Sequence, residues 1–334
     1  MSKRMFQAAP ALALAGAGLA AALLAPACRR GPAAPAWLQA APTGSQTAVS
    51  GRLGWLLQDP TFRQSLAKAP EAEQALDLFL QRAHIDPAAD PGRLTLHLMD
   101  LPKGGDPTQG ILLALDQFKD PKALQLALAS SFPPEGTLRW DGRDCPLHVI
   151  LDIETPKLKA HLRALGDPSG RIWIGDLETL TRAASGRFGP APDLARAAAW
   201  ISPEAPLQGF LRPEALLQSW KSQSGEDLPL DLPRGIAYLA WSVSPPAQKD
   251  QPYGFELALS GDEAGISQAT PWVQRLAAVA GSVQKGQAPP PEIQSGKAWV
   301  SLRMRLTGAQ VEQVLGKLGQ SFVSLPPRPG GPKA

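Results

Sequence analysis

Asparagine does not occur among the 334 residues of this chain, and cysteine, histidine and tyrosine are scarce, with two, four and two copies. The absence of asparagine excludes N-glycosylation sequons. Two cysteines exclude a disulfide-rich fold, so a hydrophobic core has to hold the protein together. Apolar residues make up 44% of the sequence, which is ordinary for a folded globular protein.

Motifs for metal binding and catalysis are also missing from the sequence. His84, His97, His148 and His161 show no His-x-x-x-His or Glu-x-x-His spacing. Cys145 lies three residues before His148 on a predicted strand, so the two side chains point to opposite faces and do not form a nucleophile–base pair. Neither a Gly-x-Ser-x-Gly elbow nor a Walker loop occurs. We therefore expect a non-enzymatic protein without metal, cofactor or catalytic residues.

Basic residues barely outnumber acidic residues in this chain. There are 33 basic and 30 acidic residues, and loss of residues 1–27 would remove Lys3 and Arg4. The longest basic cluster is Arg29-Arg30, so the chain lacks the basic stripe that tracks a phosphate backbone. We expect no nucleic-acid partner.

The first thirty residues have the layout of a secretory signal peptide. A cationic start, Met1 to Arg4, precedes the uncharged apolar run Ala11 to Ala25, and Cys28 follows the small residue Ala27. Cleavage before Cys28 would allow a lipid on its thiol, whereas ordinary A-x-A cleavage would leave that thiol free. An uncleaved anchor is the third alternative, although a spanning helix needs about 17–25 apolar residues and this run is shorter.

The cleavage site resembles that of bacterial lipoproteins, with Leu23-Leu24 followed by Ala27 immediately before Cys28. It departs from the lipoprotein pattern at Ala25, where leucine is preferred, and at Pro26. The resemblance implies lipidation at Cys28 and a protein held by its lipid anchor on the periplasmic side of a bacterial membrane.

Alternation of apolar and polar residues predicts the strands. Leu94, Leu96 and Leu98 point to one face, with Thr95 and His97 opposite. A strand with one apolar face suits an antiparallel sheet covered on one side. Asp-Gly at 141–142 predicts a hairpin turn. The fold class that we expect is α+β, with helices packed on one face of antiparallel sheets.

Helix starts carry recognisable capping signals. Asp120-Pro121 predicts an N-cap followed by proline at the first helical position. Ser260 with Glu263 predicts a capping box, and residues 307–310 repeat that pattern. Pro271 interrupts the apolar periodicity after Ser260, which predicts two short helices there.

An internal duplication is indicated by four pairs of similar segments in the same order. We expect residues 1–27 to be a signal peptide, 28–45 the lipidated cysteine and a linker, and 324–334 a disordered tail. Residues 46–187 and 204–323 would form two similar α+β units joined by the linker 188–203, with the seam between them as the place for binding. The paired segments are Val49–Gln58 with Leu207–Gln218, Arg93 with Arg234, Gly110–Leu115 with Gly254–Leu259, and Arg171–Ile174 with Lys297–Val300.

Tryptophan is abundant, with nine copies. Trp173 and Trp299 hold equivalent positions in the proposed repeats, and Trp241 ends another predicted strand. Such residues either pack across the sheet or form an aromatic surface on an open face, with Arg303 and Arg305 beside it. The second interpretation gives a binding surface for a protein, glycan or peptide.

The body of the chain resembles uncharacterised exported bacterial proteins over most of residues 36–322. The resemblance rests on the leader, on a strand and helix ending in Gln58-Asp59-Pro60, and on His84-Ile85-Asp86-Pro87 before a strand. It implies an α+β periplasmic fold and no reaction. We expect a non-catalytic interaction or ligand-binding protein of the cell envelope, with an unknown envelope protein or ligand as partner. A hydrolase of unrecognised type and a structural component of envelope assembly are the alternatives.

Overall fold

A computed structural model describes residues 35–58, 77–99, 109–155, 158–224, 235–246, 251–284, 288–311 and 313–314. Cys28, the leader and the expected tail lie outside these residues. The chain divides into two compact units. Unit 1 comprises the described residues of Ala33–Ala195 and Pro203–Leu211, and unit 2 comprises Arg196–Ser202 and those of Arg212–Ala334.

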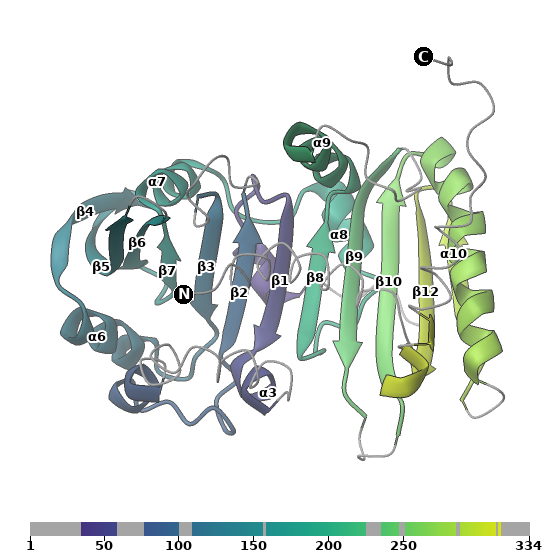
Figure 1. Ribbon diagram of the computed structural model, residues 1–334, viewed down its shortest axis with the longest axis horizontal. Coiled ribbons are helices and arrows are strands. Elements are labelled where there is room, and N and C mark those ends of the chain that lie inside the picture. Colours follow the sequence, from purple (N-terminus) through teal and green to yellow (C-terminus); the bar gives the residue numbers. More distant parts are fainter. Residues whose placement is uncertain are drawn as a thin grey trace. The chain divides into compact units, whose positions relative to one another are not determined.

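Unit 1 is an antiparallel sheet with helices (Figure 1). Its strands lie in the order β8-β1-β2-β3-β7-β6-β5-β4. The strands are β1 (Thr47–Arg52), β2 (Arg93–Leu98), β3 (Ile111–Asp116), β4 (Pro134–Trp140), β5 (Arg143–Thr155), β6 (Leu158–Gly166), β7 (Ile172–Gly175) and β8 (Leu207–Leu211). The helices are α2 (Ala36–Gln39), α3 (Leu53–Gln58), α6 (Pro121–Ser131), α7 (Leu177–Ser185) and the first part of α8 (Pro192–Ala198).

Unit 2 has the strand order β9-β10-β12-β11, also antiparallel. Its elements are α9 (Pro213–Ser224), β9 (Ile236–Ser244), β10 (Tyr253–Gly261), α10 (Glu263–Gln284), β11 (Glu292–Gly296) and β12 (Trp299–Leu306). Helix α10 packs along β10 and β12 (Figure 1). The α+β class predicted from the sequence is therefore confirmed.

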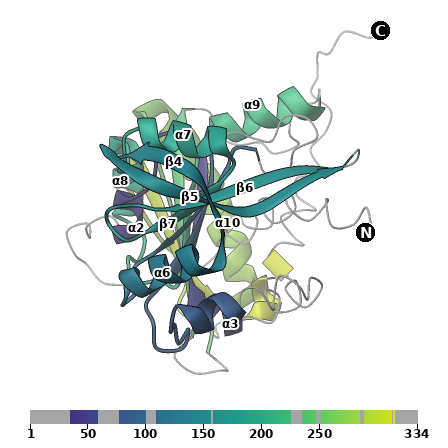
Figure 2. The ribbon, with the colours of Figure 1, turned by 90° about the vertical axis from the view of Figure 1, so that its left-hand side faces the viewer.

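Helices cover both faces of the unit 1 sheet, with α7 on one side and α6 on the other (Figure 2), which corrects the expectation of helices on one face. Adjacent residues of a strand point to opposite faces. On β7, Ile172 joins a core cluster with Leu124 of α6, whereas Trp173 joins a second cluster with Leu180 of α7. Because β7 carries apolar side chains on both faces, each face needs its own helix.

Strand β2 buries the face that the sequence pattern assigned to solvent. Thr95 and His97 are 1% exposed, whereas Leu96 is 37% exposed. The Thr95 hydroxyl donates to Ser50 Oγ at 2.9 Å, and His97 Nδ1 lies 3.2 Å from Ser45 Oγ. A polar side chain with a hydrogen-bond partner is buried at little cost, so alternation alone did not identify the buried face.

The predicted hairpin and the predicted cap of α6 are confirmed. Asp141 and Gly142 have φ values of 48° and 75°, as a type I′ turn between β4 and β5 requires. The Asp120 carboxylate accepts hydrogen bonds from the backbone N–H groups of Lys122 and Ala123. Both predictions succeeded because the signal and its structural effect lie within a few residues.

Helix α10 departs from the predicted pair of short helices, because it continues through Pro271. The Asp262 carboxylate caps it by accepting from Gly265 N at 2.6 Å, whereas Ser260 is buried within β10. The second predicted capping box forms: Thr307 N donates to Gln310 Oε1, and Gln310 N donates to Thr307 Oγ1.

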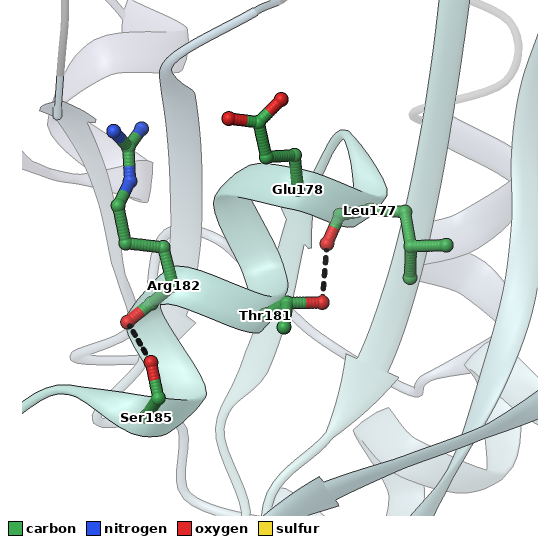
Figure 3. Close-up of a pocket in the computed structure, with 5 residues that line it drawn as sticks. All are labelled: Leu177, Glu178, Thr181, Arg182 and Ser185. Carbon is green, nitrogen blue, oxygen red and sulfur yellow. Dashed lines mark hydrogen bonds between the residues drawn. The ribbon is translucent and has the colours of Figure 1, made fainter.

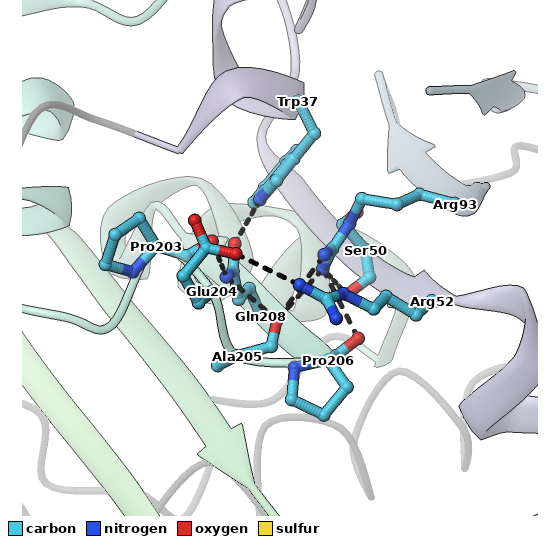
Figure 4. A network of polar contacts seen from close by, with 9 residues as sticks. All are labelled: Trp37, Ser50, Arg52, Arg93, Pro203, Glu204, Ala205, Pro206 and Gln208. Atoms are coloured by element: carbon cyan, nitrogen blue, oxygen red, sulfur yellow. Dashed lines mark hydrogen bonds and ion pairs between the residues drawn. The ribbon is translucent and has the colours of Figure 1, made fainter. Parts of the chain in front are cut away.

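A buried arginine joins β1, β2 and the segment that leads into β8 (Figure 4). Arg93 is 3% exposed, and burial lowers its pKa to about 10, so it remains a cation at neutral pH. Its Nε donates to Ser50 Oγ at 2.9 Å, and its Nη2 lies 3.2–3.3 Å from the carbonyl oxygens of Ser50, Ala205 and Pro206. Nearby, exposed Arg52 pairs with Glu204 at 3.1 Å.

We expect Arg93→Ala to destabilise the protein by about 3 kcal/mol or more, because it leaves buried carbonyl oxygens without donors. Arg52→Ala is the matched control, and its exposed ion pair predicts a loss below about 1 kcal/mol. Urea unfolding followed by circular dichroism measures both. Equal losses for the two variants would show that the buried network contributes no more than the surface pair.

Candidate functional site

The polar face of unit 2 is built by cross-strand pairs of β10 and β12. Ser260 lies opposite Trp299, Ala258 opposite Ser301, and Glu256 opposite Arg303. These side chains point away from the apolar β12 residues Val300, Leu302, Met304 and Leu306, which are at most 1% exposed. The face therefore presents aromatic, hydroxyl and charged groups in successive rows.

Two half-buried indoles stack at one end of this face. The ring centroids of Trp200 and Trp299 are 3.7 Å apart, with 19° between the ring planes. A Cβ atom at Gly296 would lie 2.6 Å from Trp299 Nε1, so glycine is needed where β11 approaches the indole. Trp200 belongs to residues Arg196–Ser202, which we call the strap and which are part of unit 2.

The other end of the strap contacts a largely buried carboxylate, that of Glu256. The backbone N–H of Ser202 donates to Glu256 Oε2, which also accepts from Ser242 Oγ at 2.9 Å. Burial raises the pKa of Glu256, while its hydrogen bonds and Arg303 act in the opposite direction. The strap thus spans from the Trp299 row to the Glu256 row, and Ser301 lies in the row between them.

Two buried donors on this face have no hydrogen-bond partner among the described residues. They are Ser301 Oγ and Arg303 Nε, which are neighbours on the same side of β12. Arg303 Nε is 3.6 Å from Glu256 Oε1, close enough for charge attraction but too long for a hydrogen bond. A buried donor without an acceptor costs free energy, so this face is incompletely satisfied while it is covered.

The tryptophans and arginines that the sequence suggested as a binding surface have different surroundings. Trp173 is fully buried, and Trp241 is 3% exposed, so neither belongs to an open face and that part of the suggestion is corrected. Trp173 packs against Trp140 and Phe188, as the alternative of packing across the sheet describes.

Trp299, Arg303 and Arg305 share the polar face of β12. Trp299 is half-buried, the Arg303 side chain is 14% exposed, and Arg305 is exposed. Sequence reasoning missed Trp200 and Glu256. Trp200 lies far from β12 in the sequence, and Glu256 lies on β10. The only signal for Glu256 was a charged residue within an apolar strand.

A second buried carboxylate lies in unit 1, at the end of β3. Asp116 is 4% exposed, and its Oδ1 has no partner among the described residues. Burial raises its pKa to about 6, although Arg171, 4.0 Å from Oδ2, and Arg93 oppose this shift. His97 shows the opposite effect, because burial lowers its pKa to about 3.

We expect Asp116→Asn to stabilise unit 1 by about 2 kcal/mol at pH 7.5. The folded-state pKa of Asp116 is about 6 and exceeds its ordinary value of 3.8. The free energy of unfolding of the wild type is therefore highest below pH 3.8, where Asp116 is protonated in both states, and it falls as pH rises through 6. Asparagine does not titrate, and its advantage should therefore vanish near pH 4. Urea unfolding at pH 4 to 8 measures this difference, and a less stable variant at pH 7.5 would show that the charged carboxylate stabilises the fold.

A shallow depression of about 610 Å³ opens on the outer side of α7 (Figure 3). All five lining residues belong to that helix. The Thr181 hydroxyl donates to the Leu177 carbonyl at 2.7 Å, and the Ser185 hydroxyl donates to the Arg182 carbonyl. These hydroxyl groups are engaged by their own helix, so the depression is a helix surface rather than a built site.

The remaining residues considered for chemistry serve the fold. Cys145 is a free, buried thiol whose pKa is raised mainly by burial, and it belongs to the core cluster around Trp173. His148 is buried, with Nδ1 3.1 Å from the Phe132 carbonyl oxygen. Asp152 and His161 form an exposed pair across β5 and β6. The described residues contain no group of three or more metal-ligating side chains.

No helix among the described residues combines the length and apolar character needed to cross a bilayer. No protein-family model, curated protein or solved structure matches this chain.

Proposed function

We propose that this protein is an exported lipoprotein of the bacterial cell envelope that acts by binding a partner and not by catalysis. The observation that carries its location is the leader, in which Cys28 directly follows an apolar run and a small residue. A lipid on Cys28 would hold the folded units at the periplasmic side of a membrane. Trp37 and Leu38 are buried in α2, which already belongs to unit 1.

The binding surface that we propose is the polar face of β12, with Trp299, Arg303 and Arg305. An indole offers a large rigid contact area, and guanidinium groups offer directed donors, a combination enriched at protein interfaces. Exposed Arg305 and half-buried Trp299 lie on the same face, with Ser301 and Arg303 between them. A carboxylate- or hydroxyl-bearing peptide or glycan fits these groups.

We further propose that the two halves of the chain arose by duplication, with strand order as support. In unit 1, β3 is followed in the chain by a helix, and β3 pairs with β7. Strand β7 also pairs with β6. In unit 2, β10 is likewise followed by a helix, and β10 pairs with β12. Strand β12 also pairs with β11. Strands β4 and β5 have no counterpart among the described strands of unit 2.

The pairing of β1 with β8, the first strands of the proposed repeats, also supports the duplication. Ser50 lies opposite Gln208 in this antiparallel pair. The similar segments of the sequence align these same two residues, because Val49-Ser50-Gly51 corresponds to Leu207-Gln208-Gly209. The two counterparts therefore lie directly opposite each other in the pairing of β1 with β8.

We expect Cys28→Ser to abolish lipid attachment and membrane association, because serine lacks the thiol that is acylated. Cell fractionation followed by mass spectrometry of the amino-terminal peptide measures both. Cys145→Ser is the matched control and should fractionate like the wild type. Membrane association of Cys28→Ser at the wild-type level would refute the lipid anchor.

A photoreactive residue in place of Arg305 should cross-link a discrete partner in intact cells, because this position borders the proposed surface. The same replacement at Arg275, an exposed arginine on α10, is the matched control. Gel electrophoresis and mass spectrometry identify the adducts. The surface assignment fails if both positions give the same adducts, or if position 305 gives none.

A further inference from the structure

The cover of the polar face in unit 2 is a short strap fixed at two points. Trp200 stacks on Trp299 at one end, and Ser202 N donates to Glu256 at the other. Between these rows lie Ser301 and Ala258, which are 1% and 0% exposed. Rows two residues apart on a strand are about 7 Å apart, so the strap crosses about 14 Å of the face.

The strap and the face beneath it are poorly matched. The rows that the strap crosses contain Ser301, which is 1% exposed, and the Glu256–Arg303 pair, whose side chains are 13–14% exposed. Ser301 Oγ and Arg303 Nε have no hydrogen-bond partner among the described residues, so closing the strap removes donors from water without replacing their bonds. Opening would let water or a ligand oxygen satisfy both donors.

Three apolar side chains of the strap are buried in the closed state, and this burial favours it. Ala197, Ala198 and Ile201 are 0%, 1% and 3% exposed. The closed arrangement therefore balances apolar burial and indole stacking against unpaired donors and a desolvated ion pair. A balance of this kind allows a ligand to select the open state, provided that it binds the uncovered face and not the covered one.

We propose that the strap Arg196–Ser202 is a lid that opens to uncover Ser301 and Arg303 for a ligand with hydrogen-bond-accepting oxygen atoms. This inference rests on the proposed function, because the lid covers part of the binding surface assigned to β12. Trp299 and Arg305 flank the covered rows and remain at the rim. The closed state is then the resting, ligand-free state.

Opening should depend on pH through Glu256. The groups that face its carboxyl are Arg303 of β12, Ser242 of β9 and Ser202 of the strap, and Glu292 of β11 lies opposite Arg303. The closed state raises the pKa of Glu256 by burial, so it holds the proton more tightly than the open state. Rising pH therefore favours opening, and acidification through the raised pKa favours closure.

The experiment is thiol labelling of the full-length protein with Ser301→Cys, read by mass spectrometry of the peptide that contains residue 301. Trp200→Ala added to this variant should increase the labelling rate about tenfold, because it removes the stacked aromatic pair. Trp272→Ala, a half-buried tryptophan of α10, is the matched control and should leave the rate unchanged.

Val300→Cys separates lid opening from unfolding of unit 2, since Val300 is fully buried on the opposite side of β12. It should stay protected when Trp200→Ala exposes residue 301.

The labelling rate at residue 301, divided by that of a free thiol peptide, should rise with pH and become pH-independent in Glu256→Gln. Equal labelling of positions 300 and 301, or no effect of Trp200→Ala, would overturn the lid. These readouts need no partner, so they remain valid if cross-linking from position 305 fails.

Discussion

The centre of unit 1 depends on the buried guanidinium of Arg93. A cation at this depth needs acceptors in several directions, and the backbone supplies them from two distant stretches of chain. Ser50 offers both its hydroxyl and its carbonyl, while Ala205 and Pro206 offer carbonyls just before β8. Arg93 therefore holds Ala205 and Pro206 beside β1, and this position allows the next residues to pair with β1 as strand β8.

Two signals contained within a few residues were read correctly from the sequence, whereas the predicted cap at Ser260 and the predicted break at Pro271 were wrong. The hairpin at Asp141-Gly142 and the cap at Asp120 formed as predicted, because positive φ and unpaired helix N–H groups are local problems with local solutions. Strand β2 shows the limit of such reading. His97 is buried through a partner about fifty residues away, Ser45, and no periodicity within β2 contains that information.

Trp173 and Trp299 illustrate the same limit at the candidate site. Both follow similar short sequences on strands that pair with the strand preceding a helix. Trp173 is enclosed by Trp140 and Phe188, whereas Trp299 stacks on Trp200 and stays half-buried. The covering residues come from segments that differ between the two halves, namely β4 and residue 188 for Trp173 and the strap for Trp299. The sequence around each tryptophan therefore could not distinguish a core residue from a surface one.

The two faces of β12 are buried in different ways, one by apolar packing and the other by a segment that covers polar side chains. Toward α10, Val300 and Leu302 pack with apolar partners, and burial there needs no polar complement. Toward the strap, hydroxyl and charged groups are covered by a segment whose Ser202 N–H donates to Glu256 and whose Trp200 stacks on Trp299. An apolar side chain at Ser301 would remove an unpaired donor and stabilise the covered state. Packing alone therefore does not explain a serine at position 301 or the unpaired Nε of Arg303, whereas the proposed opening of the strap would give both groups new partners.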